Sequence, residues 1–399
     1  MSLKNITIVI KKSISLMLIF IFNCLPIKNN KIFLFSYYGN QYGCNPKYIS
    51  EYILNNYPKD KFDLVWTFDD VSNKRTISGI REVKTMSLRY FYELCTSKII
   101  ITNFRTTDLF QKRKGQFYIQ TWHSSLRLKQ IEKDAETVLP EQYVEMAKKD
   151  SKKIDLLISG CEFSTKIFKK SFWYNGEILE YGTPRNDLLF QENSALRKKI
   201  LNKLNIPADY KVVLYAPTFR KSGSFEIYNL DYAGIQRELM KSFGGKWVFL
   251  VKFHPHMISQ SRKICGRSQV VKDVTNYDDI QELLSISDVL ISDYSSLIFD
   301  FSITQRPCFL YVPDLFEYTN QDRPLYFDLS ELPFITATSN QEFLEMIAHF
   351  NAEKYIRDLS DFLEKVGSFE EGKACELLSN RIEQICFNKK KRGITYEAV

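Results

Sequence analysis

The chain has 399 residues, of which 44% are hydrophobic and 26% are charged. This composition excludes a disordered chain, and the length suggests two domains of ordinary size. The formal net charge of +8 favours an anionic partner such as a nucleotide, an anionic polymer, an anionic lipid or a nucleic acid, without choosing among them.

Residues 1–26 form a separate N-terminal segment, in which lysines precede an apolar run over Ile14–Leu25 that ends at Pro26. A helix over this run is about 18 Å long, less than the roughly 30 Å hydrocarbon core of a bilayer. No small-residue cleavage site follows. We expect a helix lying in the cytoplasmic membrane surface, which would make the protein peripheral on that face. A signal anchor and an ordinary packed helix are the alternatives.

From residue 27 onward, short apolar runs alternate with helical patterns, as in the βαβ units of a parallel sheet. The predicted strands of the first series are Ile32–Ser36, Phe62–Phe68, Ile99–Thr102, Phe117–Thr121, Leu156–Ser159 and Ile178–Tyr181, with helices at Pro46–Asn56 and Ser164–Phe172. The stretch Gly182–Asp187 interrupts this series and is typical of a hinge or domain border.

A second series of the same kind follows this stretch. Its predicted strands are Val212–Tyr215, Trp247–Phe253, Val289–Ser292 and Cys308–Tyr311, with helices at Tyr232–Phe243, Ile280–Ile286, Leu297–Thr304, Gln341–Asn351 and Phe369–Phe387. The last helix runs into the basic stretch Lys389–Arg392. We therefore predict an α/β protein with two doubly wound parallel-sheet domains facing a cleft. The first domain would cover residues 27–186, and the second domain residues 187–399.

Four polar clusters each follow a predicted strand: Trp122–Ser125, Tyr215–Arg220, Lys252–His256 and Asp293–Ser296. Because the carboxyl ends of parallel strands share one edge of a sheet, we expect the clusters to converge. Ser295 and Ser296 stand where a strand passes into a helix, so hydroxyls and free backbone N–H groups would form a phosphate site there.

This set of side chains suits transfer from a nucleotide diphosphate. Arg220 offers a planar fork for phosphate. One histidine can act as general base on an incoming hydroxyl, and another can donate to phosphate oxygens as charge develops on them. Each residue type also has a structural interpretation: a buried or strand-end histidine, an arginine paired with a carboxylate, or serines that only cap a helix. Asp300 could pair with a lysine or with the ribose of the ligand.

Several common motifs are absent from the sequence. There is no GxxxxGK[ST] loop, no GxGxxG after the first strand and no GxSxG elbow. The acid pairs Asp69-Asp70 and Asp278-Asp279 are not DxD motifs, so no cofactor and no dedicated metal site are expected. The eight cysteines lack CxxC or zinc-like spacing, which favours a reducing cytoplasm. No aromatic–basic motif supports a nucleic-acid partner.

Six stretches together resemble the CDP-glycerol glycerophosphotransferase family, whose members make teichoic-acid-like polyol-phosphate polymers. They are Gly43–Lys47, Gln120–His123, Tyr181–Asp187, Tyr215–Arg220, His254-Pro255, and Ile291–Ser296 followed by Phe299-Asp300. Their order and approximate spacing agree with the family over roughly residues 32–330.

The resemblance implies a GT-B-like fold in which the N-terminal domain (residues 27–186) forms the acceptor side and the C-terminal domain (residues 187–399) binds most of the nucleotide. It implies transfer of glycerol phosphate from CDP-glycerol to an acceptor hydroxyl, with release of CMP, in synthesis of a teichoic-acid-like or capsular polymer. His123 would be the catalytic base, and His254 would hold the transferred phosphate. The implied substrate-binding residues are Ser124, Ser125, Arg185, Pro217, Thr218, Arg220, Pro255, Ser295, Ser296 and Asp300. A lipid-linked or polymeric acceptor and attachment to the membrane surface are also implied.

The sequence departs from the family pattern at two places. Ser124, Ser125 and Leu126 follow the histidine where the family usually has glycine, a small hydroxyl residue and often proline, and Cys44 replaces an aspartate. Ser124 has a side chain at a position where glycine would let the backbone approach a phosphate. The donor could therefore be another CDP-polyol, such as CDP-ribitol. The rival functions are a sugar-nucleotide-dependent GT-B glycosyltransferase and an inactive nucleotide-binding partner of a polymerase complex.

Overall fold

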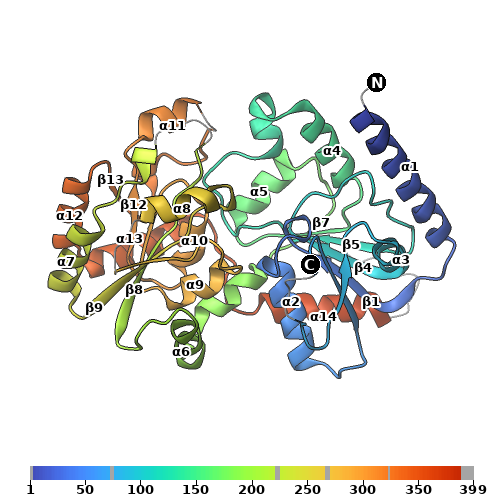
Figure 1. Ribbon diagram of the computed structural model, residues 1–399, viewed down its shortest axis with the longest axis horizontal. Helices are drawn as coiled ribbons and strands as arrows, with labels where there is room; N and C mark the ends of the chain where they lie inside the picture. The colour runs from blue at the N-terminus through green and yellow to red at the C-terminus, as the bar shows by residue number, and fades with distance from the viewer. Residues whose placement is uncertain (1–2, 72–75, 221–224, 266–269, 322–323, 388–399) are drawn as a thin grey trace, which may run out of the picture.

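The computed structural model describes residues 3–71, 76–220, 225–265, 270–321 and 324–387. Within these residues the chain forms two lobes, each built on a parallel sheet with helices on both faces (Figure 1). This is the two-domain α/β architecture that the alternating pattern predicts.

The first sheet has seven strands in the described part of the chain, in the order β3-β2-β1-β4-β5-β6-β7. The strands are β1 (Lys28–Phe35), β2 (Asp63–Phe68), β3 (Arg81–Lys84), β4 (Ser97–Thr102), β5 (Phe117–Gln120), β6 (Leu156–Ile158) and β7 (Glu177–Leu179). Alternate residues enter different cores: Ile32 and Leu34 pack on one face, and Phe33 packs on the other. Burial on both faces explains why the central strands read as continuous apolar runs.

Five helices of this lobe precede the second sheet. They are α1 (Leu3–Asn23), α2 (Cys44–Asn56), α3 (Leu88–Thr96), α4 (Glu141–Ser151) and α5 (Glu162–Ser171), and all lie in the described ranges. Short 3₁₀ segments cover Tyr37–Gly39, Glu132–Val138 and Pro184–Phe190. The predicted hinge overlaps the last of these segments. Its residues Arg185 and Asn186 are buried, and the segment packs against α2 and α9 (Ile280–Ile286).

The second sheet, counted over the described residues, has six parallel strands in the order β10-β9-β8-β11-β12-β13. They are β8 (Tyr210–Tyr215), β9 (Lys246–Val251), β10 (Val271–Asp273), β11 (Val289–Ser292), β12 (Cys308–Tyr311) and β13 (Ile335–Ala337). The remaining helices are α6 (Ser194–Lys203), α7 (Tyr232–Phe243), α8 (Ile258–Cys265), α10 (Leu297–Ser302), α11 (Leu315–Gln321), α12 (Asn340–Ala348), α13 (Ala352–Lys365) and α14 (Ala374–Phe387). Further 3₁₀ segments cover Phe225–Tyr228, Pro255–Met257 and Leu329–Glu331.

Three strands, β3, β10 and β13, were not foreseen from the sequence. Each stands at an edge of its sheet and is only partly buried. An edge strand is covered less completely than a central one, so it carries no continuous apolar run by which to recognise it.

Helix α14 returns from the second lobe to the first. It begins at Ala374, later than the predicted Phe369, and Leu378 and Ile382 join the core that contains Ile32. In Figure 1 it lies beneath α2 and β1. This helix, assigned from the sequence to the second domain, therefore packs against the first sheet. The basic stretch Lys389–Arg392 lies outside the described residues.

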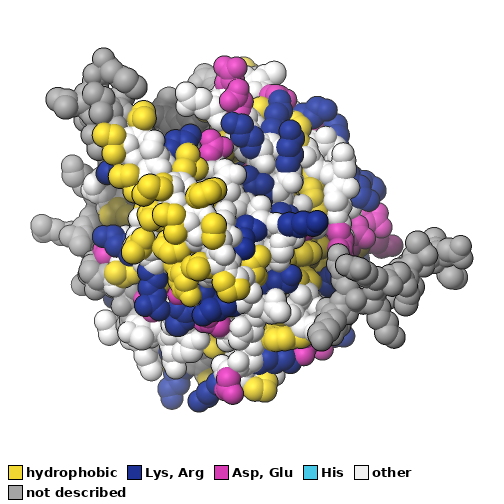
Figure 2. All heavy atoms as spheres, turned by 90° about the vertical axis from the view of Figure 1, so that its right-hand side faces the viewer, with side chains coloured by type: hydrophobic (Ala, Val, Ile, Leu, Met, Phe, Trp, Pro, Cys, Tyr) yellow, Lys and Arg dark blue, Asp and Glu magenta, His cyan; other side chains and the backbone are white. Residues whose placement is uncertain are grey.

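Helix α1 packs on α3 through one side, where Ile19 is buried against Phe91 and Cys95. Its other side exposes apolar residues, among them Met17 and Phe20. Figure 2 shows a continuous hydrophobic patch on this side of the molecule, with basic side chains beside it. Among the described residues, no helix is both long enough and apolar enough to cross a membrane.

Candidate active site

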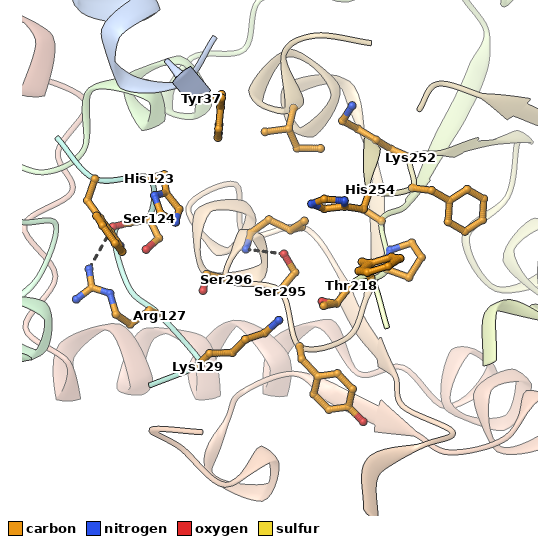
Figure 3. A pocket seen from close by; sticks show the side chains of 18 of the residues that line it. Tyr37, His123, Ser124, Arg127, Lys129, Thr218, Lys252, His254, Ser295 and Ser296 are labelled. Carbon is orange, nitrogen blue, oxygen red and sulfur yellow. Dashed lines mark hydrogen bonds between the residues drawn. The ribbon is translucent and has the colours of Figure 1, made fainter. Parts of the chain in front are cut away.

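A pocket of about 560 Å³ lies between the two sheets (Figure 3). From the first lobe and its connections it is lined by Tyr37, Trp122, His123, Ser124, Arg127, Lys129, Ile131 and Arg185. From the second lobe it is lined by Ala216, Pro217, Thr218, Phe219, Lys252, Phe253, His254, Ile280, Tyr294, Ser295, Ser296 and Leu297. The loops after β5, β8, β9 and β11 thus meet at one place.

His123 is held by its neighbours on three sides. Trp122 has a positive φ of 51°, a conformation that costs energy for a non-glycine residue and often marks functional sites. The imidazole stacks between Trp122, at 4.4 Å, and Phe104, at 5.1 Å. Its Nδ1 lies 3.2 Å from the carbonyl oxygen of Asn103. Because a carbonyl only accepts, Nδ1 carries the proton and Nε2 is the basic nitrogen of the neutral ring.

His254 has the opposite tautomer. It follows β9, and its Nδ1 accepts a hydrogen bond from the backbone N–H of His256 at 3.3 Å. The neutral ring therefore carries its proton on Nε2 and can donate there. Burial lowers the pKa of His254, and the positive charges of His256, Lys129 and Lys252 lower it further. Figure 3 shows His123 and His254 on opposite sides of the pocket, one suited to accept a proton and the other to donate a hydrogen bond.

Hydroxyl groups lie on the His254 side of the pocket. The Thr218 N–H donates to both carboxylate oxygens of Asp293, at 2.9 and 3.0 Å. Its Oγ1 is buried and has no hydrogen-bond partner among the described residues. The Ser296 Oγ accepts from the Leu128 N–H at 3.3 Å. Helix α10 has only six residues, so hydroxyls rather than a long helix dipole define this side.

Arg220 does not offer its fork to the pocket. Its Nε donates to Asp314 at 2.6 Å, its Nη2 lies 2.9 Å from Asp293, and its Nη1 donates to the Thr218 carbonyl at 2.6 Å. The guanidinium also lies over the Tyr294 ring. Two carboxylates and a carbonyl thus occupy its donors and Arg220 does not line the pocket, so the direct phosphate contact stays a prediction that this geometry does not favour. Arg220 braces the loop that carries Thr218.

Asp300 and Ser125 also lie away from the pocket, in a buried contact between the lobes. Asp300 is fully buried and forms an ion pair with Arg185. It also accepts hydrogen bonds from Ser125, Asn186 and Gln281 at 3.1, 3.2 and 3.3 Å. Burial alone would lower the pKa of Arg185, but the charge of Asp300 raises it overall. The charged partner of Asp300 is therefore an arginine rather than the suggested lysine, and a contact with the ribose of the ligand stays a prediction.

Of the predicted residues, His123, Ser124, Arg185, Pro217, Thr218, His254, Ser295 and Ser296 line the pocket. Pro255 opens the 3₁₀ turn that brings the His256 N–H back to His254. The catalytic and binding roles assigned to this set stay predictions.

Several lining cations were given no role from the sequence, although Lys252 belongs to one of the predicted polar clusters. Lys252 stands two residues before His254, and its Nζ donates to the Thr275 and Tyr277 carbonyls at 3.2 and 2.6 Å. Burial lowers the pKa of Lys252 to about 8. Burial likewise lowers the pKa of Arg127 to about 10. No carboxylate is among the described residues that line the pocket, so its field attracts anions.

The Gly43–Lys47 motif acts at the start of α2. Asn45 donates to the carbonyls of Thr121 and Trp122, at 3.2 and 3.1 Å, and accepts from the Arg185 N–H at 3.0 Å. Lys47 pairs across the lobes with Asp279 at 2.5 Å. These contacts fix the loop that presents His123 relative to the second lobe.

Comparison with known proteins identifies the family. Residues 17–384 match the model of the CDP-glycerol:poly(glycerophosphate) glycerophosphotransferases. A teichoic acid poly(glycerol phosphate) polymerase of Bacillus subtilis is 30% identical over 370 residues, which cover 90% of this chain and 49% of the relative. The chain thus spans about half the length of that polymerase.

Other relatives match along nearly their whole length. A teichoic acid glycerol-phosphate transferase of Staphylococcus aureus is 31% identical over 379 residues, covering 90% of this chain and 94% of the relative. The solved structure of the wall teichoic acid polymerase TagF superposes with a TM-score of 0.82 at 29% identity, covering 96% of this chain and 95% of that one. The fold is accordingly GT-B-like, as the resemblance implied. The chain belongs to the CDP-glycerol:poly(glycerophosphate) glycerophosphotransferase family.

Proposed function

We propose that the protein transfers glycerol phosphate from CDP-glycerol to an acceptor hydroxyl, releases CMP, and so extends or primes a teichoic-acid-like polymer. Family membership supports the reaction class. The observation that carries the proposal is the pair of imidazoles with opposite tautomers on either side of a cationic pocket.

In the proposed reaction, an acceptor hydroxyl donates to Nε2 of His123 and attacks the phosphorus that bears glycerol. A new P–O bond forms while the bond from that phosphorus to the oxygen of CMP breaks, and CMP leaves with the bonding electron pair. His123 takes the hydroxyl proton. The Nε2–H of His254 and the Thr218 hydroxyl donate to phosphate oxygens as charge moves onto them.

A donor panel tests this proposal. Purified full-length protein would be incubated with an acceptor and with CDP-glycerol, CDP-ribitol or a UDP-sugar in turn, and the products would be weighed. We expect CMP and an acceptor heavier by one or more glycerol phosphate units. Release of UDP with a glycoside product would instead establish a glycosyltransferase. If none of these donors were turned over, the result would favour the alternative of an inactive nucleotide-binding partner of a polymerase complex.

We also propose that the protein sits peripherally on the cytoplasmic membrane face, where a lipid-linked or polymeric acceptor is reached. The support is α1, which exposes Met17 by 55% and Phe20 by 74% and carries Lys11 and Lys12. Such a helix can bury its apolar face in the interface while lysines meet anionic lipid.

Charging this face should release the protein from membranes. The double change Met17→Glu and Phe20→Glu should weaken binding to anionic phospholipid vesicles by at least about 10-fold, because two large apolar side chains would no longer be buried. Co-sedimentation measures the effect. Phe316→Glu, at a side chain that is 78% exposed on α11, is the matched control and should bind as the wild type does. Equal binding by both variants would refute the role of α1.

A further inference from the structure

Residues 126–131 form a bridging segment that crosses from the first lobe to the second. The Leu128 carbonyl accepts from the Tyr326 N–H at 2.7 Å, and the Gln130 N–H donates to the Pro324 carbonyl at 2.9 Å. Lys129 and Leu325 form an isolated antiparallel bridge, and the Leu128 N–H reaches the Ser296 hydroxyl. The segment begins just after the loop that carries His123. These contacts hold the bridging segment against the second lobe, a few residues along the chain from His123.

The bridging segment brings Lys129 to the His254 side of the pocket. Its Nζ lies 5.3 Å from the centre of the Tyr318 ring. Figure 3 shows the side chain extending from the bridging segment toward Ser295 and Thr218. Lys129 also lies close enough to His254 for its charge to contribute to the lowered pKa of that ring. Lys129, which follows the loop of His123 in the chain, therefore lies beside the residues that are expected to hold phosphate.

The other lining cations contact protein groups, as Lys129 itself does. Arg185 pairs with Asp300, and Lys252 donates to two backbone carbonyls. Arg127 lies over the Phe168 ring at 4.2 Å and reaches the Ser124 carbonyl at 3.5 Å. Since the described lining residues include no carboxylate, Lys129 faces a pocket in which an anion is the complementary ligand.

We propose that Lys129 is a further catalytic residue, which contacts the phosphoryl group that is transferred. This inference rests on the proposed function. The argument is positional: the bridging segment fixes Lys129 relative to His123, and His123 must lie beside the phosphorus that the acceptor hydroxyl attacks. As the bond to CMP breaks, the ammonium donates to the non-bridging oxygens of that phosphoryl group and neutralises part of their charge.

The test compares ligands that do or do not contain this phosphoryl group. CDP-glycerol contains it, whereas CMP keeps only the phosphate next to the nucleoside. Calorimetry on the full-length protein would measure Kd for both ligands with the wild type, Lys129→Met, Lys129→Arg and the control Lys133→Met, at an exposed lysine outside the pocket. Transfer rates would be measured in parallel.

We expect Lys129→Met to weaken CDP-glycerol binding by about 10-fold or more, since it removes a hydrogen bond to a charged group, and to leave CMP binding unchanged. Its kcat should fall on the order of 100-fold. Lys129→Arg should retain most of the CDP-glycerol affinity and most of the kcat, and Lys133→Met should match the wild type in both. The pKa of His254, followed by NMR, should rise in Lys129→Met because one of the surrounding positive charges, those of His256, Lys129 and Lys252, is lost.

Three results would overturn the inference. Equal weakening of CMP and CDP-glycerol would place Lys129 on the phosphate of the nucleotide, and a changed KM for the acceptor alone would place it on the acceptor. Unchanged CDP-glycerol binding and unchanged turnover in Lys129→Met would show that Lys129 takes no part in the reaction. Failure of the proposed function itself is distinguishable, because the wild type would then release no CMP from CDP-glycerol.

Discussion

Replacing His123 with glutamine is expected to lower the rate of transfer by about 1,000-fold, because the acceptor hydroxyl loses its general base. The structure favours this residue as the base through its tautomer: Nδ1 is held by the Asn103 carbonyl, so the basic nitrogen is Nε2. Single-turnover release of CMP measures the effect. The affinity for CDP-glycerol should change little, because the proposed donors to its phosphates lie on the opposite side of the pocket.

The matched control for this change is His349→Gln, at an exposed histidine that follows α12 and is not among the residues lining the pocket. It should retain wild-type turnover. His123→Gln should also unfold at nearly the same temperature as the wild type. If that variant transferred glycerol phosphate at a rate close to the wild type, His123 would not be the base.

The second large effect concerns stability rather than turnover. Asp300→Ala should lower the free energy of unfolding by about 3–5 kcal/mol, because it leaves the Arg185 guanidinium buried without its carboxylate. The side chains of Arg185 and Asp300 are 6% and 1% exposed, so solvent cannot compensate for the loss. Denaturant unfolding monitored by circular dichroism gives the value.

Two further variants separate this mechanism from general sensitivity to mutation. Asp358→Ala breaks the ion pair with Lys354, whose members are 42% and 65% exposed, and should cost less than about 1 kcal/mol. Adding Arg185→Met to Asp300→Ala should recover part of the loss, since no buried charge then stands alone. A loss in Asp300→Ala no larger than in Asp358→Ala would contradict a structural role for the buried pair.

The contrast between His123 and Asp300 shows what the sequence could predict about the site. His123, Thr218, His254 and Ser295 each follow a buried strand, and the shared carboxyl edge of parallel strands was enough to predict their convergence. Asp300 lies one turn beyond the same edge, but its side chain pairs with Arg185, which is 115 residues away in the sequence. The position of a residue after a strand predicts that it lies near the sheet edge, but it does not predict which residue its side chain will pair with.

Arg220 illustrates the same limit. Its place after β8 suggested a phosphate ligand, yet Asp314, 94 residues along the chain, takes its Nε hydrogen bond. Lys129 was missed for the converse reason. No local pattern marks a lysine whose backbone pairs with residues 324–326 of the other lobe, because that pairing exists only after the lobes meet. Helix α14 was likewise identifiable as a helix, but its return to the first sheet was not.

The most direct test of the central claim is a crystal structure of the full-length protein with CDP-glycerol. We expect the phosphorus that bears glycerol to lie between the two imidazoles, with one of its oxygens about 3 Å from Nε2 of His254 and its opposite side open toward His123. Binding of the pyrophosphate elsewhere, for instance in the separate groove lined by Phe316 and Tyr326, would contradict the account.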